Sequence, residues 1–232
     1  VSYSVNKEDM WISRIPVPVE INASAHADDD FSKNKSIAEL TDWNIYSPVW
    51  APVSLEDQWL KLQDKDPFDY AKVERKIPAS KELKVSFDLK AGQNNKGTLQ
   101  IEFLDENGIA CSRMELTDDG IFRLKGGSRF ANMMKYEAGK VYHVEAVLST
   151  VDRNIQVYVD GKRVGLRMFY APVAAVERIV FRTGVPRTFP TVDTPADQTY
   201  DLPNAGAQDP LAEYGIANVK TSSTDKDASS AF

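Results

Sequence analysis

Apolar and polar residues alternate one by one through much of this sequence. In residues 83–90, which read Leu-Lys-Val-Ser-Phe-Asp-Leu-Lys, every second side chain is apolar. Successive side chains of a β-strand point to opposite faces, so this pattern predicts a strand with one face on a core and one in water. The same alternation predicts strands at residues 98–103, 141–148 and 155–159.

Tight-turn residues separate these segments. Asp105-Glu106-Asn107-Gly108, Asp118-Asp119-Gly120 and Asp160-Gly161 contain the residue types that tolerate the positive φ angles of hairpin turns. We expect further strands at residues 72–76, 111–116, 121–124, 162–167, 178–183 and 215–219. Short strands, regular turns and little helical periodicity indicate an all-β fold, a two-sheet antiparallel β-sandwich.

Three segments fall outside this pattern. Residues 54–63 leave two alternatives open, because Ser54 with Asp57 could cap a short helix, whereas Leu60-Lys61-Leu62-Gln63 alternates like a strand. Residues 184–213 are rich in Pro, Gly and small polar residues and predict a long loop. Residues 221–232, rich in Ser, Asp and Ala, predict a frayed tail.

Composition supports one sizeable domain and argues against several partners. With 232 residues, of which 42% are hydrophobic, the chain can bury a single large core. A net charge of −6 argues against nucleic acid as a partner. No apolar run approaches the roughly 20 residues of a membrane span. Cys111 is the only cysteine, so no intrachain disulfide forms, and we interpret it as a small strand residue rather than a nucleophile.

The first twenty residues differ from the rest. They contain a charged turn, one short predicted strand and a Pro-x-Pro stop, and a polar gap separates them from the alternating pattern. We interpret residues 1–20 as the terminal strand and linker of an upstream module, residues 21–221 as the sandwich and residues 222–232 as a flexible tail. We therefore expect the chain to be a fragment of a larger protein, and any secretion signal to lie upstream or to have been removed.

Two segments resemble known families. Residues 154–162, Asn-Ile-Gln-Val-Tyr-Val-Asp-Gly-Lys, are similar to the hairpin of concanavalin A-like, laminin-G-like jelly-roll domains, a resemblance that covers about residues 41–221. Residues 6–16 resemble the final strand of the sialidase-type β-propellers of bacterial glycoside hydrolases and polysaccharide lyases. These resemblances imply a non-catalytic accessory sandwich that packs on an upstream β-propeller of a periplasmic or extracellular protein. An alternative is that the sandwich contributes residues to the active site of such an enzyme.

Catalytic and metal-binding patterns are weak. Glucanase-type jelly rolls carry Glu-x-Asp-x-x-Glu on one strand, with the two carboxyl groups about 5 Å apart. Residues 102–106, Glu-Phe-Leu-Asp-Glu, lack this spacing, so we interpret Glu102 as part of a solvated strand face and assign no catalytic residue. Asp28-Asp29-Asp30 could offer oxygen ligands to calcium, but consecutive carboxylates do not converge on one ion, so we interpret them, with His26, as a solvated linker. We assign no metal and no cofactor.

Sugar binding needs flat aromatic faces beside a few polar groups. Trp43, Tyr46, Trp50 and Trp59 fall within a 17-residue stretch and could form a glycan platform; alternatively, Trp43 and Trp50 plug the ends of the sandwich or dock onto a neighbouring module. We take as tentative contacts with an oligo- or polysaccharide the residues Trp43, Tyr46, Trp50, His143, Phe169 and Tyr170.

Basic residues recur between positions 111 and 135. They would suit an acidic glycan through charge-assisted hydrogen bonds, but alternating polar positions on an exposed sheet face explain them without any ligand, and we favour that interpretation. They are Arg113, Arg123, Lys125, Arg129 and Lys135.

Overall fold

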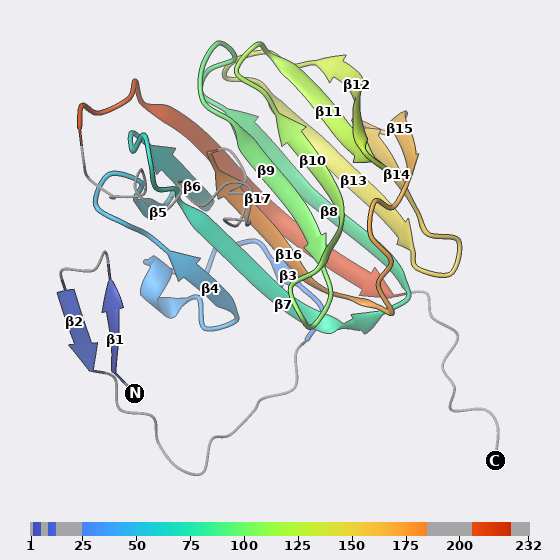
Figure 1. Ribbon diagram of the computed structural model, residues 1–232, viewed down its shortest axis with the longest axis horizontal. Helices are drawn as coiled ribbons and strands as arrows, with labels where there is room; N and C mark the ends of the chain where they lie inside the picture. The colour runs from blue at the N-terminus through green and yellow to red at the C-terminus, as the bar shows by residue number, and fades with distance from the viewer. Residues whose placement is uncertain (1, 6–8, 13–24, 185–205, 224–232) are drawn as a thin grey trace, which may run out of the picture.

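The computed structural model describes residues 2–5, 9–12, 25–184 and 206–223, and Figure 1 shows their strands. Near the N-terminus, β1 (Ser2–Val5) pairs antiparallel with β2 (Asp9–Ile12). The sequence predicted one strand here, and the structure corrects this to a hairpin. The polar residues 6–8 interrupt the run of strand-forming residues, which splits it into two pairing segments.

An eight-stranded antiparallel sheet forms one layer of a sandwich. Its order is β15-β14-β13-β8-β17-β6-β5, and the short β3 pairs with β17. The bounds are β3 (Asp28–Asp29), β5 (Val53–Glu56), β6 (Trp59–Asp64), β8 (Glu82–Ala91), β13 (Val141–Ser149), β14 (Asn154–Val159), β15 (Lys162–Met168) and β17 (Ala212–Ser223).

A seven-stranded antiparallel sheet forms the second layer. Its order is β12-β11-β10-β9-β16-β7-β4. The bounds are β4 (Trp43–Tyr46), β7 (Lys72–Ser80), β9 (Leu99–Leu104), β10 (Ala110–Leu116), β11 (Ile121–Gly126), β12 (Arg129–Lys135) and β16 (Val176–Thr183). A single 3-10 turn, η1 (Ile37–Glu39), precedes β4 in the described chain.

The core lies between the two sheets and consists of the alternating apolar residues. Phe87 of β8 and Phe181 of β16 are fully buried, and their rings meet edge to face at 5.1 Å. This contact joins the two layers, and edge-to-face geometry suits the opposite charges of ring edge and ring face. The two-sheet antiparallel sandwich of the concanavalin A type is therefore confirmed.

The predicted strands are all present, several of them longer than expected. Residues 54–63 form the β5–β6 hairpin and not a helix, because Leu60 and Leu62 alternate into the core. β4 and β12 had not been predicted. β17 extends to Ser223, so the start of the predicted tail at 221–223 is a strand; residues 224–232 and 185–205, which hold the rest of the predicted tail and most of the predicted loop, lie outside the described residues. No helix in the described part of the chain is long and apolar enough to cross a membrane.

The segment at residues 25–30 is part of the fold rather than a solvated linker. Asp29, in β3, accepts hydrogen bonds from Arg75 Nε at 2.8 Å and from Trp43 Nε1 at 3.0 Å. Arg75 points inward from β7 and is only 3% exposed. The neighbouring Asp28 forms an ion pair with Lys220, and Asp30 accepts a hydrogen bond from the backbone N–H of Ser32. The three consecutive carboxylates thus have three separate partners, which corrects the linker interpretation.

Candidate functional site

A two-residue turn places an aromatic side chain on the outer face of the eight-stranded sheet. Glu56 of β5 lies opposite Trp59 of β6, and the two turn residues between them, Asp57 and Gln58, have positive φ angles of 51° and 65°. Such φ values match the twist of a tight hairpin. Leu60 and Leu62 point into the core, so the alternation turns Trp59 and Lys61 toward the outside.

Two small residues of β17 lie beside this tryptophan. Gly215 lies opposite Lys61 of β6 on one side and Lys90 of β8 on the other. The next outward position on β17 is Ala217, which is opposite Asp88. A strand with Gly and Ala between strands that carry Trp and Lys forms the floor of a shallow trough.

The indole of Trp59 packs across this floor. A Cβ atom added to Gly215 would lie 2.9 Å from Cε3 of Trp59, closer than side-chain contacts allow. Trp59 is only partly buried, so a portion of the indole faces solvent. Glycine at 215 therefore lets the ring lie against the sheet, where its orientation is fixed.

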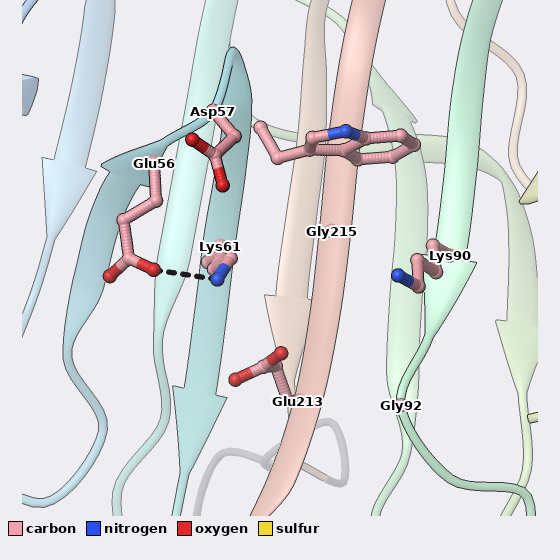
Figure 2. Close-up of a pocket in the computed structure, with 8 residues that line it drawn as sticks. Glu56, Asp57, Lys61, Lys90, Gly92, Glu213 and Gly215 are labelled. Carbon is pink, nitrogen blue, oxygen red and sulfur yellow. Dashed lines mark hydrogen bonds and ion pairs between the residues drawn. The ribbon is translucent and has the colours of Figure 1, made fainter. Parts of the chain in front are cut away.

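Charged groups surround the indole and form a pocket of about 230 Å³ (Figure 2). Glu56 and Lys61 form an ion pair of 2.6 Å between Oε2 and Nζ. This hydrogen bond lowers the pKa of Glu56 and raises that of Lys61. The pocket is lined by Glu56, Asp57, Trp59, Lys61, Lys90, Gly92, Glu213 and Gly215.

Further contacts orient the polar groups of the pocket. Gln63 Nε2 donates to Glu213 Oε2 at 2.7 Å, and the backbone N–H of Glu213 donates to Gln93 at 2.9 Å. Lys90 is exposed, and its side chain makes no hydrogen bond or ion pair with any described residue. The pocket thus combines one aromatic face with a fixed carboxylate and a free ammonium group, which can bind hydroxyl groups of a ligand.

The tryptophan-rich stretch separates into different environments. Trp43 is 7% exposed and packs between Phe31 and Phe181, so its ring has no free face for a ligand. Tyr46 is exposed at 37%, and its hydroxyl donates to Asp69 at 2.8 Å. Trp50 is partly buried in the turn between β4 and β5. Neither Trp43, Tyr46 nor Trp50 lines the pocket that Trp59 forms.

The other tentative contacts are also spread over the molecule. His143 is exposed on β13, on the same sheet face as Trp59, and its Nδ1 lies 2.8 Å from Asp88 Oδ1. Phe169 and Tyr170 follow β15 and are partly buried. Lys125 Nζ lies 4.4 Å from the centre of the Tyr170 ring, and burial raises the pKa of Tyr170 to about 12. These two aromatic rings belong to the packing of the sandwich.

The polar residues of the seven-stranded sheet are largely paired with one another. Glu102 is 8% exposed and forms an ion pair of 2.5 Å with Arg113, which corrects its interpretation as part of a solvated face. Arg123 pairs with Glu115 and also lies over the ring of Phe130. Arg129 and Lys135 are exposed at the two ends of β12. The ion pair with Arg113 gives Glu102 a structural role, and it is not one of a pair of facing carboxylates.

The geometry defines a class of protein: an all-β, two-sheet sandwich module with an aromatic and polar pocket on the outer face of one sheet. Comparison with known protein families identifies the family of this chain. The chain belongs to the sialidase-like CBM domain family, whose model matches residues 43–198. It is a non-catalytic accessory domain, as the sequence predicted.

Solved structures agree with this assignment. A sialidase structure is 89% identical, has a TM-score of 0.88, and is matched over 97% of this chain and 21% of the sialidase chain. Two remote structures show the fold alone. One comes from work on endo-acting O-glycanases of the human gut microbiota (12% identity, TM-score 0.58, 84% of this chain and 97% of the other). The other is the apo Crh5 transglycosylase (11% identity, TM-score 0.61, 88% and 85%). No curated protein matches the sequence.

Sequence reasoning missed most of the pocket. Trp59 was noted among the clustered aromatic residues and Lys61 within the alternating segment, but neither was selected, and Lys90, Glu213 and Gly215 gave no signal. The alternation at residues 60–63 could have placed Trp59 and Lys61 on the outer face. The pairing of β6 with β17 could not be read from the sequence, because residues 61 and 215 are far apart along the chain.

Proposed function

We propose that this domain binds glycan on the outer face of its eight-stranded sheet, as an accessory module of a longer sialidase-type protein that works outside the cytoplasm. The observation that carries the proposal is the indole of Trp59, held against Gly215 and flanked by Lys61, Lys90 and Glu213. The family assignment and the similarity to part of a sialidase support it.

The pocket has the chemistry that sugar binding needs. Sugar rings present C–H groups on their faces and hydroxyl groups around their edges, so a ligand site for them combines an apolar surface with a few oriented polar groups. Trp59 supplies the apolar surface, and its position costs little entropy because the sheet already fixes the ring. Glu213 accepts and Lys90 donates hydrogen bonds at the edge of that surface.

Titration calorimetry of the 232-residue chain against an oligosaccharide panel tests this proposal. For any sugar that binds, we expect Trp59→Ala to lower the affinity at least tenfold. A tenfold change corresponds to about 1.4 kcal/mol of binding free energy. Trp50→Ala is the matched control, since Trp50 lies outside the pocket. A loss of affinity with Trp50→Ala and none with Trp59→Ala would move the site to the β4–β5 turn.

Packing on a neighbouring domain is a second candidate function, favoured by β15. This strand is at the edge of the eight-stranded sheet and exposes Leu166 at 46% and Met168 at 58%. Exposed apolar side chains on an open edge are a liability that proteins cover. We infer that the cover is the upstream β-propeller of the same polypeptide, because the chain spans only 21% of the similar sialidase.

Hydrogen exchange tests this second function. The amides of β15 should exchange more slowly in the longer polypeptide, with its upstream module, than in the 232-residue chain. The amides of β5, at the opposite edge of the same sheet, are the internal reference. Equal exchange of β15 in both proteins would contradict the packing proposal.

A further inference from the structure

A second polar cluster lies on the same sheet face as the Trp59 pocket. Both carboxylate oxygens of Asp88, in β8, have a side-chain partner. Oδ1 lies 2.8 Å from Nδ1 of His143, and Oδ2 accepts a hydrogen bond of 2.7 Å from Nδ2 of Asn218. His143 and Asn218 are exposed. Each carboxylate oxygen retains further acceptor capacity, so the cluster can receive hydroxyl groups while its own members hold it in place.

A bulge in β17 builds this cluster. The register between β17 and β8 shifts between Ala217 and Lys220, and Asn218 within the shift has a positive φ of 52°. A bulge redirects a side chain that regular alternation would place elsewhere. Here the amide of Asn218 reaches the outer face, where it contacts Asp88. Asparagine tolerates the left-handed conformation better than most residues.

The cluster and the pocket are neighbours. Asp88 and Lys90 are separated by one residue on β8, which places their outward Cβ atoms about 7 Å apart. Lys90 lines the pocket, and Asp88 lies directly opposite Ala217, the residue that continues the trough floor beyond Gly215. Neighbouring units of one oligosaccharide can therefore contact both.

The charges along this trough are unbalanced. Three carboxylates and two ammonium groups line the pocket, Glu56, Asp57 and Glu213 against Lys61 and Lys90, and Asp88 in the neighbouring cluster adds a fourth carboxylate. Lys61 is already paired with Glu56, which leaves Lys90 as the available cation. A net negative trough repels an anionic ligand and accepts hydroxyl groups, so charge discriminates against carboxylated sugars.

We propose that Asp88, His143 and Asn218 form a second subsite, and that the ligand is a neutral oligosaccharide extending from Trp59 to this cluster. The inference rests on the proposed glycan binding and specifies its ligand class. A single sugar fills the Trp59 pocket only. A longer neutral chain contacts both subsites, and a unit that bears a carboxylate is excluded from the trough.

Calorimetry on the 232-residue chain separates the two subsites. The probes are a neutral monosaccharide, the neutral oligosaccharides that contain it, and the same oligosaccharides ending in a carboxylated sugar. We expect the neutral oligosaccharide to bind at least tenfold more tightly than the monosaccharide. Asp88→Ala should remove this gain and leave monosaccharide affinity unchanged, because only the second subsite is lost.

Lys84→Ala is the matched control. Lys84 lies on the same face of β8 but pairs with Glu145 at 2.7 Å, away from Asp88. Its substitution should leave every affinity within twofold. Thermal unfolding of each variant shows that the fold is retained.

Each failure has its own signature. Monosaccharide binding that depends on Trp59, without any gain from length or any effect of Asp88→Ala, would overturn the second subsite and leave the proposed function standing. Tighter binding of the carboxylated series would overturn the neutral ligand class. Absence of binding by every sugar would refute the proposed function itself.

Discussion

The ring of Trp59 lies against the backbone of Gly215, with room for a hydrogen atom but not for a methyl group. A Cβ at position 215 would be 2.9 Å from Cε3 of the indole. Because Trp59 is partly exposed, the ring can rotate into solvent when it is displaced. The close contact therefore sets the geometry of the pocket more than it sets the stability of the domain.

Gly215→Ala should consequently weaken sugar binding about tenfold while lowering the free energy of unfolding by only about 1 kcal/mol. Tryptophan fluorescence should report the displaced ring. Gly92→Ala is the control in the same pocket, since its added Cβ would meet nothing closer than 3.6 Å. Equal effects of the two substitutions on binding would contradict the role of the ring position.

Adjacent aspartates in β3 should differ sharply in their contribution to stability. Asp29→Ala removes the acceptor of Trp43 Nε1 and leaves the buried Arg75 with only the exposed Asp42 at 3.6 Å and the Lys76 carbonyl, so we expect a loss of about 3 kcal/mol. Asp28→Ala breaks only an exposed pair with Lys220, which contributes about 0–1 kcal/mol. Urea unfolding measures both, and similar losses would refute the buried-pair account.

Asp64, at the end of β6, should make stability fall as pH rises. Burial raises its pKa from 3.8 to about 6, so the folded state binds a proton more tightly than the unfolded state does. The contribution of Asp64 to the free energy of unfolding is fully present below about pH 4. It is lost between about pH 4 and pH 6, a decrease of about 3 kcal/mol in total.

Asp64→Asn should remove this dependence. The variant should be the more stable protein at pH 7 and should match the original near pH 4, as measured by urea unfolding at a series of pH values. Parallel curves for the two proteins between pH 4 and pH 7 would show that Asp64 does not titrate as described.

Cys111 should be unreactive in the folded domain. It is fully buried in β10, and burial raises its pKa to about 12, so almost no thiolate exists near neutral pH. A thiol reagent at pH 8 should label it only as fast as the domain unfolds, and rapidly in denaturant. Rapid labelling of the native protein would contradict its position in the core.

The sandwich was predictable because its signal is local. The alternation in β8, β13 and β14 reflects one wet and one dry face, and Asp160-Gly161 marks the turn that follows β14. β12 was not predicted because it is an edge strand whose residues are exposed or partly buried without regular alternation. β4 was not predicted because Pro48 and Pro52, which follow it closely, suggested a loop.

The candidate site was less predictable because it depends on pairing between distant strands. Trp59 became a platform only through its contact with Gly215, and His143 became part of a cluster only through Asp88 and a bulge at Asn218. Trp43 shows the opposite case. Its sequence neighbourhood resembles a sugar platform, yet the partly buried Asp29 carboxylate and the ring of Phe181 hold it inside the sandwich.

The place of β17 in the sheet has a consequence for how the domain is made. This strand comes last among the described elements, yet it lies between β8 and β6 in the middle of its sheet. During synthesis, the two halves of that sheet have no partner until residues 212–223 leave the ribosome. Non-local pairing of this kind is slow, so the nascent chain exposes the open edges of β8 and β6 until β17 is inserted between them.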